Sequence, residues 1–267
     1  MPIHPTAIVE RSAEIDPTAD IGPYAVVETG VKIGAACKLW HHAFVATGTT
    51  LGERVQIHPF AVVGHPPQDL AWKGEPSYTR IGDDTIIREH ATVHRGTMPE
   101  SVTTVGKKCF LMSTAHVGHN CTVDDEVIFA NAAILGGHVR VGRKAFISAA
   151  AIVHQFCRIG EFAMLGGVTR IPTDVPPFAM VMPGGVVGLN VVGLRRNGFS
   201  PAERAELRVI YKMIYRSKRS TRDAIADAAK LVQTPAGKRF VEFLQEPAKR
   251  PLMRYYGGRD GAPIDAD

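Results

Sequence analysis

The chain has 267 residues and a formal net charge of +5, which is long enough for one large domain and a smaller one. Its hydrophobic content of 45% and charged content of 21% are typical of a soluble globular protein. No basic segment precedes an apolar run near Met1, and no apolar stretch reaches the roughly 18 residues of a membrane span. We therefore expect no signal peptide, no membrane insertion and a cytoplasmic location.

An aliphatic residue returns every six residues from Ile3 to Ile171. Of the 29 positions in this phase, 25 are Ile, Leu or Val, one is Phe129, and Asp69, Glu75 and Pro99 break the series. A period of six is typical of a parallel β-helix. The pattern resembles the left-handed parallel β-helix of hexapeptide-repeat proteins, in which three hexads form one coil of 18 residues. We expect about ten coils over residues 1–189.

The breaks in phase predict two loop excursions, at residues 69–80 and 99–104. Both segments are polar, both contain proline, and both return the chain to the same register. Loops of this kind often carry functional residues, although a tolerated insertion is the alternative.

The four cysteines fit the repeat rather than a metal or disulfide site. Each lies four places after an aliphatic position, in a slot that otherwise holds Ala, Val or Thr in nearly every repeat. We therefore expect Cys37, Cys109, Cys121 and Cys157 to be small buried residues, and no metal site.

Helical patterns replace the repeat after Pro176 and Pro177. Ser200 to Glu203 forms a capping box with proline at the first helical position, and Ser220 and Thr234 are expected to begin two further helices. We expect a small α-helical C-terminal domain over residues 190–267. Nine Lys or Arg against two acidic residues occur over 195–222, which suits an acidic protein partner or nucleic acid, with a solvated helix face as the alternative.

Four of the eleven histidines converge in a β-helix with 18-residue coils. His119, Gly137 and Gln155 are 18 residues apart and stack in one column. His138 lies beside this column, His116 shares a coil with His119, and His154 is next to Gln155. Because histidine transfers protons near neutral pH, the cluster predicts a catalytic site.

Several segments identify a specific resemblance. Residues 116–123 (HVGHNCTV), 135–142 (LGGHVRVG), 152–167 (IVHQFCRIGEFAMLGG), 66–77 (PPQDLAWKGEPS), 92–97 (TVHRGT) and 188–200 (GLNVVGLRRNGFS) are similar to the UDP-N-acetylglucosamine O-acyltransferases that begin lipid A biosynthesis. The similarity covers the whole chain. It implies a homotrimer, with sites between subunits, that transfers a 3-hydroxyacyl group from acyl carrier protein to the sugar 3-hydroxyl. It implies no cofactor and no nucleic acid partner, and the acidic carrier would suit the basic helices.

The resemblance also assigns roles to residues. His119 matches the general base, and the Gly137 N–H would stabilise the oxyanion. Gly167 matches the residue that limits acyl length, where glycine leaves room for a longer chain. The positions that match substrate-binding residues are Asp69, His116, His138, His154, Gln155, Asn190 and Arg196.

The chain departs from the family pattern at four positions. Asn120 stands where Asp usually neighbours the catalytic histidine, and an amide can orient an imidazole without stabilising imidazolium by charge. Ala71 replaces a lysine, for which Lys73 could compensate. Val192 replaces a glutamate that contacts the nucleotide, and Asn197 replaces an arginine.

Other functions remain open on the sequence. One is acylation of an amino sugar nucleotide, either the 3-amino analogue or the substrate of the sister N-acyltransferase. Another is a γ-type carbonic anhydrase, whose zinc would need three histidines such as His116, His119 and His138. A third is a non-catalytic binding protein, which the departures at Asn120, Ala71 and Val192 would favour.

Overall fold

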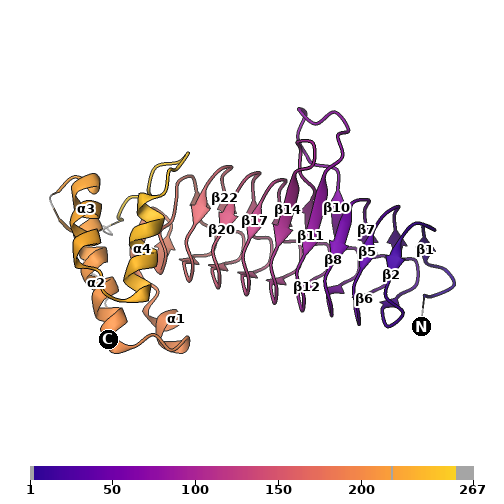
Figure 1. Ribbon diagram of the computed structural model, residues 1–267, viewed down its shortest axis with the longest axis horizontal. Coiled ribbons are helices and arrows are strands. Elements are labelled where there is room, and N and C mark those ends of the chain that lie inside the picture. Colours follow the sequence, from indigo (N-terminus) through magenta and orange to yellow (C-terminus); the bar gives the residue numbers. More distant parts are fainter. Residues whose placement is uncertain (1–2, 218, 257–267) are drawn as a thin grey trace.

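The computed structural model describes residues 3–217 and 219–256, and shows a long three-sided prism with helices at its C-terminal end (Figure 1). Its sides are three parallel sheets of nine, eight and ten strands, to which only the last strand, β27, is antiparallel. The hexads at 69, 75 and 99 lie in loops and add no strands. The remaining 26 of the 29 hexads, at three per coil, form about nine coils rather than the predicted ten.

We call the three sides face 1, face 2 and face 3, in the order in which the chain follows them. Face 1 contains β3 (Asp20–Ile21), β6 (Lys38–Leu39), β9 (Gln56–Ile57), β12 (Ile86–Ile87), β15 (Phe110–Leu111), β18 (Ile128–Phe129), β21 (Phe146–Ile147), β24 (Met164–Leu165), β26 (Ala179–Met182) and β27 (Gly185–Leu189). Face 2 contains β1 (Ile8–Val9), β4 (Val26–Val27), β7 (Phe44–Val45), β10 (Val62–His65), β13 (Thr92–His94), β16 (His116–Val117), β19 (Ile134–Leu135), β22 (Ile152–Val153) and β25 (Arg170–Ile171). Face 3 contains β2 (Glu14–Ile15), β5 (Lys32–Ile33), β8 (Thr49–Leu51), β11 (Tyr78–Ile81), β14 (Val102–Val105), β17 (Thr122–Val123), β20 (Arg140–Val141) and β23 (Arg158–Ile159).

The six-residue period produces the core of the prism. The aliphatic residue of each hexad points inward, and the small residue four places later fills the space behind it, so both columns are buried from Ala19 to Val181 outside the two excursions. All four cysteines are free and buried in this small-residue column, and burial raises the pKa of the Cys109 thiol to about 12. The structural interpretation of the cysteines is therefore confirmed.

The left-handed corners of the coils do not require glycine. The left-handed backbone conformation occurs three places after the aliphatic residue, and non-glycine residues such as Asn120, His138 and Phe156 adopt it. The glycines one place after the aliphatic residue serve close approach between coils. A Cβ on Gly34 would lie 2.4 Å from the carbonyl oxygen of Gly52 on the next coil.

Both excursions leave the prism at the corner between faces 2 and 3, where they stand out above β10 and β14 (Figure 1). They occupy residues 66–77 and 95–101, a few residues earlier than predicted, because β11 and β14 are each four residues long. A hydrogen bond from the Glu100 N–H to the Pro76 oxygen joins the excursions, and the Tyr78 N–H at the start of β11 donates to the Ser101 oxygen.

Four helices follow the prism: α1 (Val191–Arg196), α2 (Pro201–Tyr215), α3 (Thr221–Leu231) and α4 (Pro235–Gln245). The capping box at Ser200 and the helix starts at Ser220 and Thr234 agree with the sequence. Buried Phe178, from the end of the prism, packs against Phe240 of α4, so the helices share a core with the last coils. Residues 257–267 of the predicted helical domain lie outside the described part of the chain.

In the described residues no helix is long and apolar enough to cross a membrane.

Candidate active site

His119 lies at the corner between faces 2 and 3, and its position depends on Gly137 one coil away. Only 6% of His119 is exposed. A Cβ on Gly137 would lie 2.3 Å from Cε1 and 2.4 Å from Nε2 of the imidazole, so the ring covers the Gly137 backbone. The predicted stacking of these two residues is therefore present, and it requires glycine at 137.

Polar groups lie on both sides of the His119 ring. Nδ1 is 2.9 Å from Oδ1 of Asn120, and Nε2 is 3.8 Å from Oδ2 of Asp69 on the first excursion. Because Asn120 Oδ1 can only accept, His119 Nδ1 carries the proton and Nε2 keeps its lone pair. This is the tautomer that a general base needs if a substrate hydroxyl enters between Nε2 and Asp69.

His138 and His116 flank His119. The His138 ring meets the His119 ring edge to face, with centroids 5.2 Å apart, and stacks on Phe156 at 4.7 Å. The His116 Nδ1 is 2.7 Å from Oγ1 of Thr92 on face 2. Burial lowers the pKa of both His138 and His116, and nearby His119 lowers it further. Both rings are therefore suited to remain neutral hydrogen-bonding groups near pH 7.

His154 and Gln155 continue the same corner one coil further on. The Gln155 side chain packs against Gly136, beside Gly137. Arg250, which follows α4, donates to Nδ1 of His154 at 2.8 Å and to the Gln155 carbonyl at 3.0 Å. Sequence reasoning missed Arg250 because it is 95 or more residues away from both partners.

Three predicted site residues lie at other corners of the chain. Asn190 caps α1, accepts from the Gly193 N–H and donates to the carbonyl of Phe162 at the corner between faces 3 and 1. Arg196 is exposed at the end of the same helix. Gly167 is exposed at the corner between faces 1 and 2. One chain therefore does not bring these three residues to His119.

Three of the four departures from the family pattern, all except Asn120, lie on the surface. Ala71 is exposed on the first excursion, and the Lys73 ammonium donates to the Leu70 oxygen within that loop. Val192 is 52% exposed on α1. Asn197 ends α1 and accepts a 2.8 Å hydrogen bond from the Lys144 ammonium.

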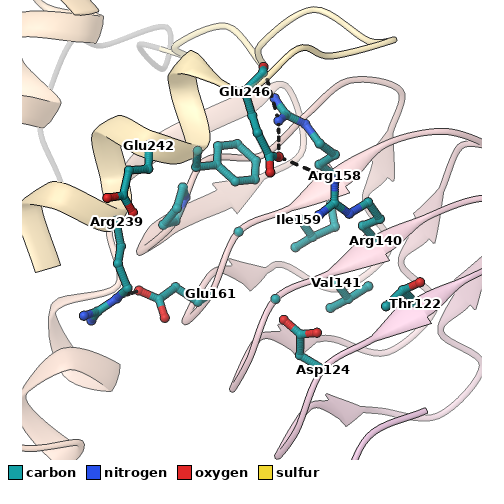
Figure 2. Close-up of a pocket in the computed structure, with 14 residues that line it drawn as sticks. Thr122, Asp124, Arg140, Val141, Arg158, Ile159, Glu161, Arg239, Glu242 and Glu246 are labelled. Atoms are coloured by element: carbon teal, nitrogen blue, oxygen red, sulfur yellow. Dashed lines mark hydrogen bonds and ion pairs between the residues drawn. The ribbon is translucent and has the colours of Figure 1, made fainter. Parts of the chain in front are cut away.

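A separate cleft of about 350 Å³ lies on face 3 beneath α4 (Figure 2). Its charged groups are largely paired with each other: Arg158 and Arg140 with Glu246, and Arg239 with Glu161. None of the predicted site residues lines this cleft.

Known proteins resemble the chain over nearly its full length. The family described as "Udp N-acetylglucosamine O-acyltransferase; Domain 2" matches residues 174–253. The acyl-[acyl-carrier-protein]–UDP-N-acetylglucosamine O-acyltransferase of Burkholderia lata is 45% identical over 260 residues, which cover 94% of this chain and 99% of that protein. The chain belongs to the UDP-N-acetylglucosamine O-acyltransferase family.

Solved structures of this family have the same fold. The UDP-N-acetylglucosamine acyltransferase of Francisella novicida superposes with a TM-score of 0.93 at 32% identity, over 99% of both chains. The UDP-N-acetylglucosamine O-acyltransferase of Moraxella catarrhalis gives 0.91 at 36% identity, over 94% of this chain and 99% of that one. The predicted left-handed β-helix with a helical C-terminal region is confirmed, and the family favours an acyltransferase over a carbonic anhydrase.

Proposed function

We propose that the chain transfers a 3-hydroxyacyl group from acyl carrier protein to the 3-hydroxyl of UDP-N-acetylglucosamine, the first step of lipid A biosynthesis. Family membership supports the donor and the acceptor, because the relatives' names contain both. The observation that supports the chemistry is the position of His119, whose Nδ1 lies 2.9 Å from Asn120 Oδ1 and whose Nε2 faces the Asp69 carboxylate at 3.8 Å.

The proposed reaction is a direct acyl transfer. His119 Nε2 removes the proton from the sugar hydroxyl as its oxygen attacks the thioester carbonyl carbon. The carbonyl oxygen becomes negative and accepts a hydrogen bond from the Gly137 N–H. When the intermediate collapses, the C–S bond breaks and the carrier thiolate leaves with the proton that His119 holds. No covalent acyl-enzyme forms, because no reactive Ser or Cys accompanies His119.

The remaining predicted residues are proposed to bind substrate. Asp69 would hold the sugar from the excursion, and His116, His138, His154 and Gln155 would line the same corner. Gly167 would leave room for a long acyl chain. A Cβ added at this position would meet only the Ala149 carbonyl oxygen within 4 Å, at 3.4 Å.

We also propose that the active protein is a homotrimer, because one chain separates parts of the site. From β12 to β24 the outward residues of face 1 form an apolar row, whereas those of β3, β6 and β9 and those of face 3 are polar. The face 1 row is Ile86, Phe110, Ile128, Phe146 and Met164. The face 3 row is Thr104, Thr122, Arg140 and Arg158. Face 2 adds outward Ile134 and Ile152, the second of which is 49% exposed.

The corner between faces 1 and 2 carries a ladder of stacked rings. Tyr24, His42, Phe60 and His90 stack with centroids between 5.0 and 5.2 Å apart, and Tyr24 is 55% exposed. Exposed apolar surface of this extent indicates a protein contact. If this corner faced a three-fold axis, face 1 of one copy would cover face 2 of the next. Asn190 and Arg196 would then approach the His119 corner of the neighbouring copy.

The helices offer a basic surface for the acidic carrier protein. Arg208 and Lys212 are exposed one turn apart on α2, and Arg195, Arg196 and Arg222 are also exposed. Opposite charges of this kind increase the rate of association.

An acyl-transfer assay tests the proposed function. The protein would be incubated with a 3-hydroxyacyl carrier protein and UDP-N-acetylglucosamine, or its 3-amino analogue, across several acyl lengths. We expect product with the hydroxyl acceptor, and a loss of at least about 100-fold in His119→Ala, as is typical when a general base is removed. Absence of product with either acceptor would indicate a binding protein. Product that persists in His119→Ala would contradict the assigned base but not the activity.

A further inference from the structure

The amide of Asn120 poses a problem that a carboxylate would not. A carboxylate presents an oxygen to a neighbouring imidazole in either orientation. An asparagine can present either its oxygen or its NH2 group, and the two ends have similar shapes. If the NH2 group faced His119, Nδ1 would have to accept and Nε2 would carry the proton. His119 would then be unable to act as a base at Nε2.

Thr97 on the second excursion resolves this ambiguity. Its backbone N–H donates to Oδ1 of Asn120 at 3.1 Å, and its hydroxyl donates to the same oxygen at 2.9 Å. A backbone N–H can only donate, so the Asn120 end that faces Thr97 and His119 must be the oxygen. Thr97 is only 7% exposed, which protects both bonds from competition by water.

The Asn120 and Thr97 backbones are both fixed. The Asn120 N–H donates to the buried Thr103 hydroxyl at 2.8 Å. Asn120 itself is a left-handed corner residue with φ of 58°. The second excursion is closed by Ser101, whose hydroxyl accepts from the Met98 N–H at 3.0 Å and donates to the Met98 carbonyl at 2.7 Å. The excursion therefore holds Thr97 at a defined place beside the site.

We propose that Thr97 is a positioning residue that orients the Asn120 amide and thereby keeps the His119 proton on Nδ1. This inference rests on the proposed role of His119 as the base. It assigns a task to the second excursion, and it explains how an asparagine can work where a carboxylate is usual. Thr97 acts through Asn120, since the hydrogen bonds of its backbone N–H and its hydroxyl both end on the Asn120 oxygen.

Two substitutions at Thr97, compared in two backgrounds, test the proposal. Thr97→Val keeps the shape and the backbone N–H but removes the hydroxyl, whereas Thr97→Ser retains the hydroxyl. Loss of one hydrogen bond should lower kcat by about fivefold in Thr97→Val, and Thr97→Ser should stay within about twofold of the parent. In an Asn120→Asp background, either carboxylate oxygen can accept from His119. Thr97→Val should therefore lower kcat by less than about twofold there.

The tautomer of His119 gives a readout that is independent of activity. With 15N-labelled histidine, the ring nitrogen shifts distinguish Nδ1–H from Nε2–H, and the His119→Gln variant identifies the resonances of His119 among the eleven histidines. We expect neutral His119 to be Nδ1–H in the parent protein. In Thr97→Val the backbone N–H alone holds the Asn120 oxygen toward His119, so a minor Nε2–H fraction should appear, with no such increase in the Asn120→Asp background.

The outcomes separate this inference from the proposed function. A parent protein with no transferase activity would contradict the function, while the nitrogen shifts would still test the orientation of Asn120. An active parent in which Thr97→Val changes neither kcat nor the tautomer would overturn the role of Thr97. Equal losses in the Asn120 and Asn120→Asp backgrounds would show that Thr97 supports the loop in general rather than the amide orientation.

Discussion

At the scale of single residues, the stacked coils make the size of one side chain decide the position of another. His119 can cover the backbone at 137 only because that residue has no Cβ. The same stacking places the Gly137 N–H and the His119 ring on one surface, where a carbonyl oxygen and a hydroxyl can be bound together.

We predict that Gly137→Ala inactivates the protein without unfolding it. The new Cβ would lie 2.3 Å from His119 Cε1, so the imidazole must move by about 1 Å, and a displacement of that size can lower kcat by about 100-fold. Gly188→Ala is a matched control, because a Cβ there meets nothing within 4 Å. Steady-state kinetics and thermal unfolding of both variants check this. Full activity in Gly137→Ala would contradict the stacked geometry.

His94 provides a prediction about pH. It is 6% exposed, and burial, together with His116, His65 and His119, lowers its pKa to about 4 from the usual 6.5. The unfolded chain therefore binds more protons than the folded chain between these values, and stability falls as the pH drops through this window. His94 alone should remove about 2 kcal/mol of the free energy of unfolding between pH 7 and pH 5.

Urea unfolding of the parent and of His94→Gln at pH 7 and pH 5, at one protein concentration, measures this contribution. The variant should lose less stability over this interval, although His116 and His138 retain lowered pKa values of their own. The same loss in both proteins would show that His94 is not buried as a neutral ring.

At the scale of elements, the segment after α4 connects the helices to the site. This C-terminal strap, residues 246–256, pairs with the last coils through hydrogen bonds between Asp174 and both Pro251 and Met253. Arg250 lies on the strap and holds His154 through Nδ1. Because guanidinium only donates, its 2.8 Å contact favours a neutral His154 with the proton on Nε2, against the longer 3.3 Å contact of Nδ1 with the Gln155 carbonyl oxygen.

We therefore predict that Arg250→Met raises the KM for the sugar nucleotide by about fivefold, with a smaller change in kcat, because the variant loses hydrogen bonds that orient a binding group. Arg254→Met is the matched control, since Arg254 is exposed on the same strap. Kinetics with varied sugar nucleotide separate the two parameters. A fall in kcat at constant KM would place Arg250 in the chemical step instead.

The elements differ in how far the sequence predicts them. The hexad period and the capping box at Ser200 predict strands and helix starts, because both signals are local and agree with the packing that surrounds them. The corner residues with positive φ were not expected, because side chains such as Tyr24 and Phe60 are unusual in that conformation. They gain stacking partners that are adjacent only after the coils have formed. Thr97 and Arg250 were missed because their partners are distant in sequence.

At the scale of the whole molecule, periodicity predicts the column of His119, Gly137 and Gln155 but cannot show what lies outside the prism. Asn190 and Arg196 match family positions in sequence, yet their helix lies at another corner of the same chain. A single chain contains the complete repeat but separates the proposed site residues, which is why the proposed assembly matters for the proposed activity.

The apolar row on face 1 leads to a prediction about assembly. Ile128→Arg places a charge in the middle of that row, and because an unpaired charge is costly to bury, the trimer should dissociate. Thr122→Arg, which is exposed on face 3, is the matched control and should leave the mass unchanged. Light scattering after size exclusion should give about three times 28.9 kDa for the parent and the control, and one third of that mass for Ile128→Arg. Because Asn190 and Arg196 would then lack a neighbouring His119, the transferase activity should fall with the mass. A monomeric variant that retained full activity would show that each chain carries a complete site and that α1 takes no part in it.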